Sequence, residues 1–255
     1  MNQLNFFDLI LSLILIGIAL GIASWQKLGL SSQIIIATGR SLVQLLAVAY
    51  VLDFIFIFNN PWLVLITVGV MSVIAAVFIN SHLGKKLRGL FLIIWGAILT
   101  AIAVILCYTT ILIVQPDTWY QPQYLIPITA MILANAINAS TITGGRLVSA
   151  INNNRLEIET HLSLGATPQQ AITAYHREAI RAGLIPTLNQ MTVIAMATIP
   201  AFFSGQLLAG VDPLNAASYE ILLLFMQILV NLIVTSLITQ GIYRRFFNQN
   251  WQLVN

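Results

Sequence analysis

Long apolar runs alternate with short polar stretches along the whole chain, and most of the runs reach the length of about 20 residues that a helix needs to cross a bilayer. Inside lipid, only helices and closed barrels satisfy every backbone hydrogen-bonding group. The pattern therefore predicts an all-α, polytopic membrane protein with about seven transmembrane helices. The predicted spans cover residues 5–25, 33–58, 61–80, 90–114, 124–143, 184–208 and 219–243.

Two of these runs depart from a simple span. Arg40 lies within the second run, so this run is either one long helix or a short interfacial helix followed by a span. In the sixth run, Pro200 lacks a backbone donor, and Gly205 and Gly210 follow it closely. These residues predict a kinked or broken helix in the outer part of span six.

Composition supports the membrane class. The 255 residues are 58% hydrophobic and only 7% charged, whereas about a quarter of the residues of a soluble domain are charged. We expect one integral membrane domain, residues 1–255, embedded in the lipid bilayer. The single cysteine, Cys107, excludes a disulfide within the chain.

The basic residues orient the predicted spans, because Lys and Arg concentrate in cytoplasmic loops. They fall before or early in span two, between spans three and four, between spans five and six, and after span seven. This distribution predicts an outside N-terminus and a cytoplasmic C-terminus, as an odd number of spans requires, and it makes nucleic-acid binding an unlikely reason for the basic balance. The basic residues are Lys27, Arg40, Lys85, Lys86, Arg88, Arg146, Arg155, Arg177, Arg181, Arg244 and Arg245.

One cytoplasmic connection, residues 144–183, is long and carries helix start and stop signals. Asn152, Asn153 and Asn154 can cap a helix, and Gly165 suits the left-handed residue that ends one. Within this helix, Arg155 with Glu159 and Glu157 with His161 are spaced i, i+4 and can pair. Thr167, Pro168 and Gln170 then form a capping box that starts a second helix.

Two interpretations of this helix–break–helix segment remain open. It could dock into the groove of a cytoplasmic partner, or it could be an interfacial helix pair that binds lipid headgroups.

Polar side chains within the spans are candidates for a transport pathway, because they are costly in lipid. The alternative is structural, since Asn, Gln, Ser and Thr often form hydrogen bonds between helices. No His-x-x-His, cysteine pair or carboxylate cluster lies within a span, so a tight metal site is not expected and any metal ligands are unknown. The pathway candidates are Asn135, Asn138, Asn189, Gln190, Met191, Met196, Gln227 and Asn231.

Other classes fit less well. A retinal protein needs a lysine within the bundle, and an intramembrane protease needs a serine–base pair or His-Glu-x-x-His; the chain offers neither, so it is not expected to be an enzyme. A heptahelical receptor is less specifically matched. A secondary transporter or channel is the main alternative, although the spans hold few ionisable groups.

Three stretches of the C-terminal half resemble the FetB family of ABC-transporter permeases, which is associated with iron export, and its plant relatives linked to aluminium tolerance. Residues 152–171 read NNNRLEIETHLSLGATPQQA, residues 177–191 read REAIRAGLIPTLNQM, and residues 204–213 read SGQLLAGVDP. The spacing of Glu159 and Gly165 also resembles the coupling helix of many bacterial importers, but Thr160 and His161 replace the usual alanines.

The resemblance implies the permease subunit of an ABC transporter, exporting a metal ion, in the plasma (inner) membrane. The chain has no G-x-x-x-x-G-K-[ST] loop, so ATP and Mg²⁺ would bind a separate cytoplasmic ATPase and the permease itself would bind no cofactor. A permease homodimer is the simplest symmetric assembly. The residues implied to contact or orient the ATPase are Arg155, Glu157, Glu159, Gly165, Ala166, Thr167 and Pro168.

Overall fold

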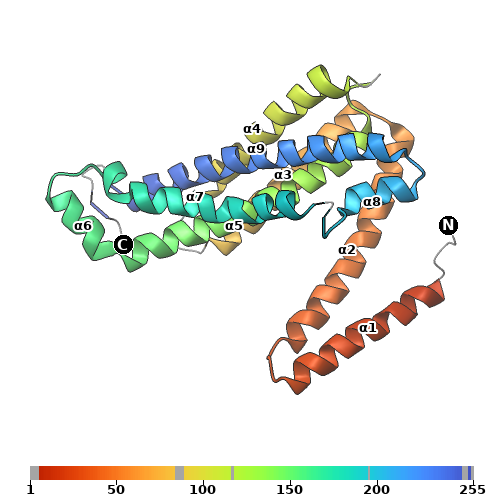
Figure 1. The fold of residues 1–255 in the computed structure, drawn as a ribbon, viewed down its shortest axis with the longest axis horizontal. Helices are drawn as coiled ribbons and strands as arrows, with labels where there is room; N and C mark the ends of the chain where they lie inside the picture. The colour runs from red at the N-terminus through yellow and green to blue at the C-terminus, as the bar shows by residue number, and fades with distance from the viewer. Residues whose placement is uncertain (1–5, 84–88, 116–117, 195, 249–251, 254–255) are drawn as a thin grey trace. The chain divides into compact units, whose positions relative to one another are not determined.

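All regular secondary structure in the described part of the chain is helical (Figure 1). The structure is a computed structural model that describes residues 6–83, 89–115, 118–194, 196–248 and 252–253. Its elements are α1 (Phe6–Trp25), α2 (Ser31–Phe58), α3 (Pro61–His82), α4 (Phe91–Tyr108), the π-helix η1 (Thr109–Val114), α5 (Pro122–Asn153), α6 (Arg155–Ser163), α7 (Pro168–Val193), α8 (Ala201–Leu208) and α9 (Pro213–Phe246).

The fold confirms a polytopic, all-α membrane protein. In the described part of the chain, five helices are long and apolar enough to cross a bilayer: α2, α3, α4 with η1, α5 and α9. The apolar part of α1, Leu11–Trp25, is shorter. The second predicted span is one continuous helix of 28 residues. The orientation of the spans stays a prediction, and three of the basic residues that it rests on, Lys85, Lys86 and Arg88, lie outside the described residues.

The predicted span six, residues 184–208, is divided between two helices. Helix α7 ends at Val193, and the eight-residue helix α8 begins only at Ala201, after Pro200. The predicted break near Pro200 is therefore confirmed. Helix α7 also runs through Gly183 and Pro186, where the sequence predicted the end of a cytoplasmic helix; one proline costs a single backbone bond, which packing on both sides of it can offset.

Segment 144–183 is almost entirely helical. Helix α5 continues ten residues past the predicted end of span five at Thr143, so the segment consists of the end of α5, all of α6 and the first part of α7. Its helices are therefore continuous with the bundle.

The chain divides into two compact units, Met1–Asn59 and Asn60–Asn255, so the prediction of a single domain stays a prediction. The first unit is a hairpin of α1 and α2, which pack against each other. Most of the large apolar side chains of this hairpin are exposed, including Leu45 and Ile57. Lipid is the solvent that accommodates such a surface.

The second unit is built around α5, α7 and α9, which run side by side, with α6 at one end (Figure 1). Helix α3 packs on α5, and α4 packs on α3 and α9. The core between them is dominated by Ile and Ala, for example Ile98, Ile132 and Ile238. Small residues let helix backbones approach closely, which drives helix association in membranes.

The closest approach of α5 and α7 lies at Gly183. A Cβ atom there would overlap the Thr143 hydroxyl and lie 2.6 Å from the Ala139 carbonyl oxygen. Only glycine fits this position without displacing the backbone of α5. The contact fixes the register of the two helices that carry α6 between them.

Candidate functional site

The turn between α6 and α7 is fixed by two local motifs. Gly165 has φ +90°, and the backbone N–H groups of Gly165 and Ala166 donate to the carbonyls of Leu162 and His161, which is a Schellman motif. The Thr167 hydroxyl then accepts from the Gln170 N–H, and the Gln170 side chain accepts from the Thr167 N–H. The predicted left-handed glycine and capping box are confirmed.

The start of α6 differs from the prediction. Asn154 occupies the N-cap position, but its side chain makes no capping bond and instead donates to the Ala150 carbonyl at the end of α5. The predicted pairing of Arg155 with Glu159 is not among the ion pairs of the described residues, whereas that of Glu157 with His161 is present at 3.8 Å. Because α5 passes almost directly into α6, Asn154 bonds backward to α5.

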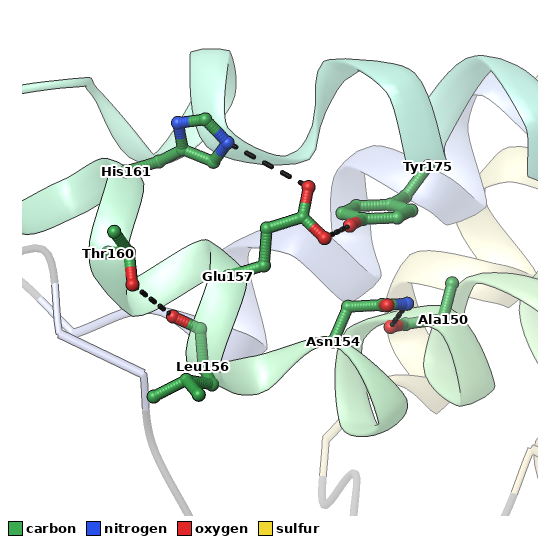
Figure 2. Close-up of polar contacts among 7 residues, drawn as sticks. All are labelled: Ala150, Asn154, Leu156, Glu157, Thr160, His161 and Tyr175. Carbon is green, nitrogen blue, oxygen red and sulfur yellow. Dashed lines mark hydrogen bonds and ion pairs between the residues drawn. The ribbon is translucent and has the colours of Figure 1, made fainter.

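Glu157 ties α6 to α7. Its carboxylate accepts a hydrogen bond of 2.8 Å from the Tyr175 hydroxyl on α7 and lies beside the His161 ring (Figure 2). Desolvation, followed by the hydrogen bond to Glu157, raises the pKa of Tyr175, so the phenol remains a donor at neutral pH. Ile158, fully buried on the same corner, adds an apolar anchor. The helix is therefore held in a defined orientation.

Tyr175→Phe should loosen this corner without unfolding the bundle. Loss of the hydrogen bond to Glu157 costs roughly 1 kcal/mol locally, so amide hydrogens of α6 should exchange several-fold faster while those of α9 are unchanged. Thr173→Ala, on the same helix, removes only a hydroxyl that bonds its own helix backbone and is the matched control. Unchanged exchange in α6 would mean that Glu157 does not hold it.

Two exposed leucines that the sequence analysis did not single out lie on α6 and at its C-terminal cap. Leu156 and Leu164 are each 80% exposed, and Glu159 lies exposed between them. If this short polar helix lies outside the bilayer, its large apolar side chains are not covered by lipid. Exposed apolar side chains of this kind typically mark a contact with another protein. Glu157 therefore contacts α7, while the side chains of Leu156, Glu159 and Leu164 are exposed and have no hydrogen-bond or ion-pair partner among the described residues.

Inside the bundle, α7 and α9 are joined by a buried hydrogen bond of 2.8 Å from the Asn231 amide to the Thr187 hydroxyl. Several other buried polar atoms of the bundle have no hydrogen-bond partner among the described residues. They belong to Thr129, Ser140 and Thr143 of α5 and to Gln227 and Asn231 of α9. An unpaired buried polar group typically costs 1–3 kcal/mol, so these polar atoms need an explanation beyond packing.

The eight predicted pathway residues do not gather in one chamber. Gln227 and Asn231 are buried in the bundle, whereas Asn138, Asn189 and Met196 are exposed, Met196 within the break after α7. The remaining three, Asn135, Gln190 and Met191, are half-buried. They therefore form two groups: a buried one on α9, and a surface one on α5, α7 and the segment after α7.

The pathway candidates chosen from the sequence do not include Thr143, Thr187 or Glu220. Glu220 is almost fully buried on α9, lines a hollow of about 310 Å³ with Pro200 and Phe203, and leaves one carboxylate oxygen without a partner. Thr143 and Thr187 lie one turn from other polar residues, so the polar spacing of the spans indicates both. Glu220 carried no such signal, since it lies close to a predicted helix end, where acids are common.

No group of three or more His, Cys, Asp or Glu side chains within the described ranges could hold a metal ion. Asn, Gln and Thr oxygens of the interior remain as hard-cation donors.

These features define a multi-pass helical membrane protein with a structured polar corner at one end and a polar interior. The sequence profile of the family described as "Uncharacterised protein family (UPF0014)" matches residues 6–247. The chain belongs to the UPF0014 family.

Relatives align over nearly the whole chain. The UPF0014 membrane protein slr1647 of Synechocystis is 45% identical over 99% of this chain and 97% of its own length. The "Probable iron export permease protein FetB" of Escherichia coli is 32% identical over 100% and 97%, and the protein ALUMINUM SENSITIVE 3 of Arabidopsis thaliana is 28% identical over 95% and 87%. No solved structure matches the chain significantly.

Proposed function

We propose that this chain is the membrane-spanning permease of an ABC transporter that exports a metal ion, with iron as the first candidate. The family relation to FetB, named as a probable iron export permease, supports the transport class. ATP and Mg²⁺ would bind a separate cytoplasmic ATPase, and the permease would act as a homodimer in the inner membrane.

The observation that carries the proposal is the geometry of α6. Two capping motifs and the Glu157–Tyr175 bond hold the helix rigidly to the bundle, while Leu156, Glu159 and Leu164 are exposed. A helix that must transmit motion needs both properties: a stiff link to the spans and an exposed face for the motor. Gly165, Ala166, Thr167 and Pro168 form that link, and Arg155 begins the helix.

The exposed polar side chains on α5 and α7, those of Asn138 and Asn189, support a homodimer in which a second copy of the chain packs on this face within the membrane. The antiparallel helices α5 and α7 touch at Ala139 and Gly183. At 1.5 Å per residue, Asn135 lies about 6 Å and Asn189 about 9 Å from this contact, toward the same end of the bundle. Exposed amides such as those of Asn138 and Asn189 are costly against lipid. A symmetric copy covering this face would enclose them in a shared pathway.

Asn189→Leu should impair cargo movement while leaving assembly with the ATPase intact. The substitution removes an exposed amide from the proposed pathway and needs no repacking, because the side chain is exposed. We expect transport to fall about tenfold or more, as loss of a hydrogen-bonding contact of 1–2 kcal/mol allows. Leu188→Asn, at the adjacent exposed position, changes the polarity of the same surface outside the proposed pathway and should leave transport at the wild-type rate. Normal transport by Asn189→Leu would mean that Asn189 has a structural role only.

Reconstitution tests the function directly. The permease and its ATPase, placed together in liposomes, should move Fe²⁺ only when ATP is hydrolysed, and an ATPase lacking its P-loop lysine should abolish transport. Transport at full rate by the permease alone would instead establish a secondary transporter or channel.

A further inference from the structure

The end of the bundle that carries α6 contains a basic hollow between α7 and α9 that plays no part in the proposed coupling. Its volume is about 500 Å³. The lining that matters is polar or basic and comes from both helices: Thr173, His176 and Arg177 of α7, and Gln240, Tyr243 and Arg244 of α9.

The positive charge of this hollow is not neutralised by the described residues. Neither Arg177 nor Arg244 forms an ion pair with any of them, and no acid lines the hollow. The nearest acid in sequence, Glu178, pairs with Arg146 of α5. Burial lowers the pKa of His176, so the imidazole is neutral at pH 7 and the two guanidinium groups supply the charge.

A second hollow, of about 380 Å³, adjoins the first and has a different character. It is a furrow between α4 and α9 lined by Ile93, Gly96, Ala97, Thr100, Leu237 and Gly241, and it shares Gln240 and Arg244 with the basic hollow. From Arg244 to Leu237 it follows α9 for about 10 Å toward the middle of the bundle, at 1.5 Å per residue. A charged mouth thus opens into a narrow, mostly apolar channel on the helix surface.

We propose that the basic hollow and the furrow together bind one anionic phospholipid, with the phosphate between Arg177 and Arg244 and an acyl chain along α4 and α9. Guanidinium groups bind phosphate through paired, charge-assisted hydrogen bonds. The positive-inside rule assigns this end of the bundle to the cytoplasmic leaflet, where anionic lipids concentrate. A free phosphate ion would bind in the hollow but would make no contact with the mostly apolar furrow.

The site joins α9 to α7, the helix against which α6 packs. Arg177 lies two residues beyond Tyr175, the tyrosine that holds Glu157, and Arg244 lies at the end of α9. A lipid phosphate bound to both would fasten α7 to α9 close in sequence to the tyrosine that holds α6.

Native mass spectrometry of the delipidated full-length protein, titrated with dioleoyl phosphatidylglycerol or dioleoyl phosphatidylcholine, tests the proposal. We expect the anionic phosphatidylglycerol to bind more tightly than phosphatidylcholine. Arg177→Gln and Arg244→Gln should each lower its affinity about fivefold, the effect of one basic residue at an anionic membrane surface. Arg181→Gln, an exposed arginine on α7 outside the hollow, should leave it unchanged.

A separate variant tests whether an acyl chain binds in the furrow. A Cβ at Gly96 meets no atom within 4 Å, so Gly96→Leu fills the furrow without disturbing the fold, and it should also weaken lipid binding. Gly69→Leu, at an equally open position on α3, is its control. Equal binding of the two lipids, or wild-type affinity of the double arginine variant, overturns the proposal. Displacement by millimolar inorganic phosphate with no effect of Gly96→Leu also overturns it, in favour of a free-anion site.

Discussion

The triple variant Leu156→Ser, Glu159→Arg, Leu164→Ser should lose binding to the ATPase while its bundle stays folded. All three side chains are exposed on α6, so their replacement leaves no cavity. If they sit in the partner's groove, each contributes roughly 1–2 kcal/mol, as central interface residues do. The affinity should therefore fall on the order of a hundredfold or more, measured by titrating the purified ATPase onto the permease.

Leu214→Ser is the matched control for this variant. Leu214 is 79% exposed, much like Leu156 and Leu164, but it lies at the start of α9, far along the chain from α6. Its replacement should leave ATPase binding at the wild-type level. Wild-type binding by the triple variant would mean that the exposed surface of α6 is not the docking surface.

Gly183→Ala should destabilise the bundle strongly for so small a change. The added methyl group would overlap the Thr143 hydroxyl and press on the Ala139 carbonyl, a backbone atom that cannot rotate away. Overpacking of this kind costs about 1–3 kcal/mol and occasionally more. The apparent melting temperature, measured by size-exclusion chromatography of heated samples, should fall.

Gly69→Ala should not destabilise the protein and is the control for Gly183→Ala. Its Cβ meets nothing within 4 Å, and alanine favours a helix over glycine by roughly 0.5–1 kcal/mol, so the melting temperature should hold or rise slightly. A melting temperature of Gly183→Ala equal to that of the wild type would contradict the close contact of α5 and α7.

What could be predicted from the sequence was local. The left-handed Gly165 and the Thr167–Gln170 capping box depend on residues only a few positions apart, and both appear as expected. The role of Asn154 and the continuation of α7 through Pro186 could not be predicted in this way. They depend on α5 leading directly into α6 and on α5 packing against α7, which are set by residues far apart in the chain.

The polar residues show a second limit. In a soluble helix, apolar periodicity separates the buried face from the exposed one, but in a membrane both faces are apolar. The pattern therefore could not tell buried Asn231 from exposed Asn138 and Asn189, although all three stood out equally as polar. Nor could it show that Thr187 is the partner of Asn231, since 44 positions separate them.

Purification of this chain from its native membrane in mild detergent, followed by mass spectrometry of the proteins that accompany it, tests the central claim most directly. The account predicts a stoichiometric soluble ATPase that is present with the wild type and with Leu214→Ser and is lost with Glu159→Arg. A chain recovered without any ATPase, from membranes that contain ABC ATPases, would contradict it.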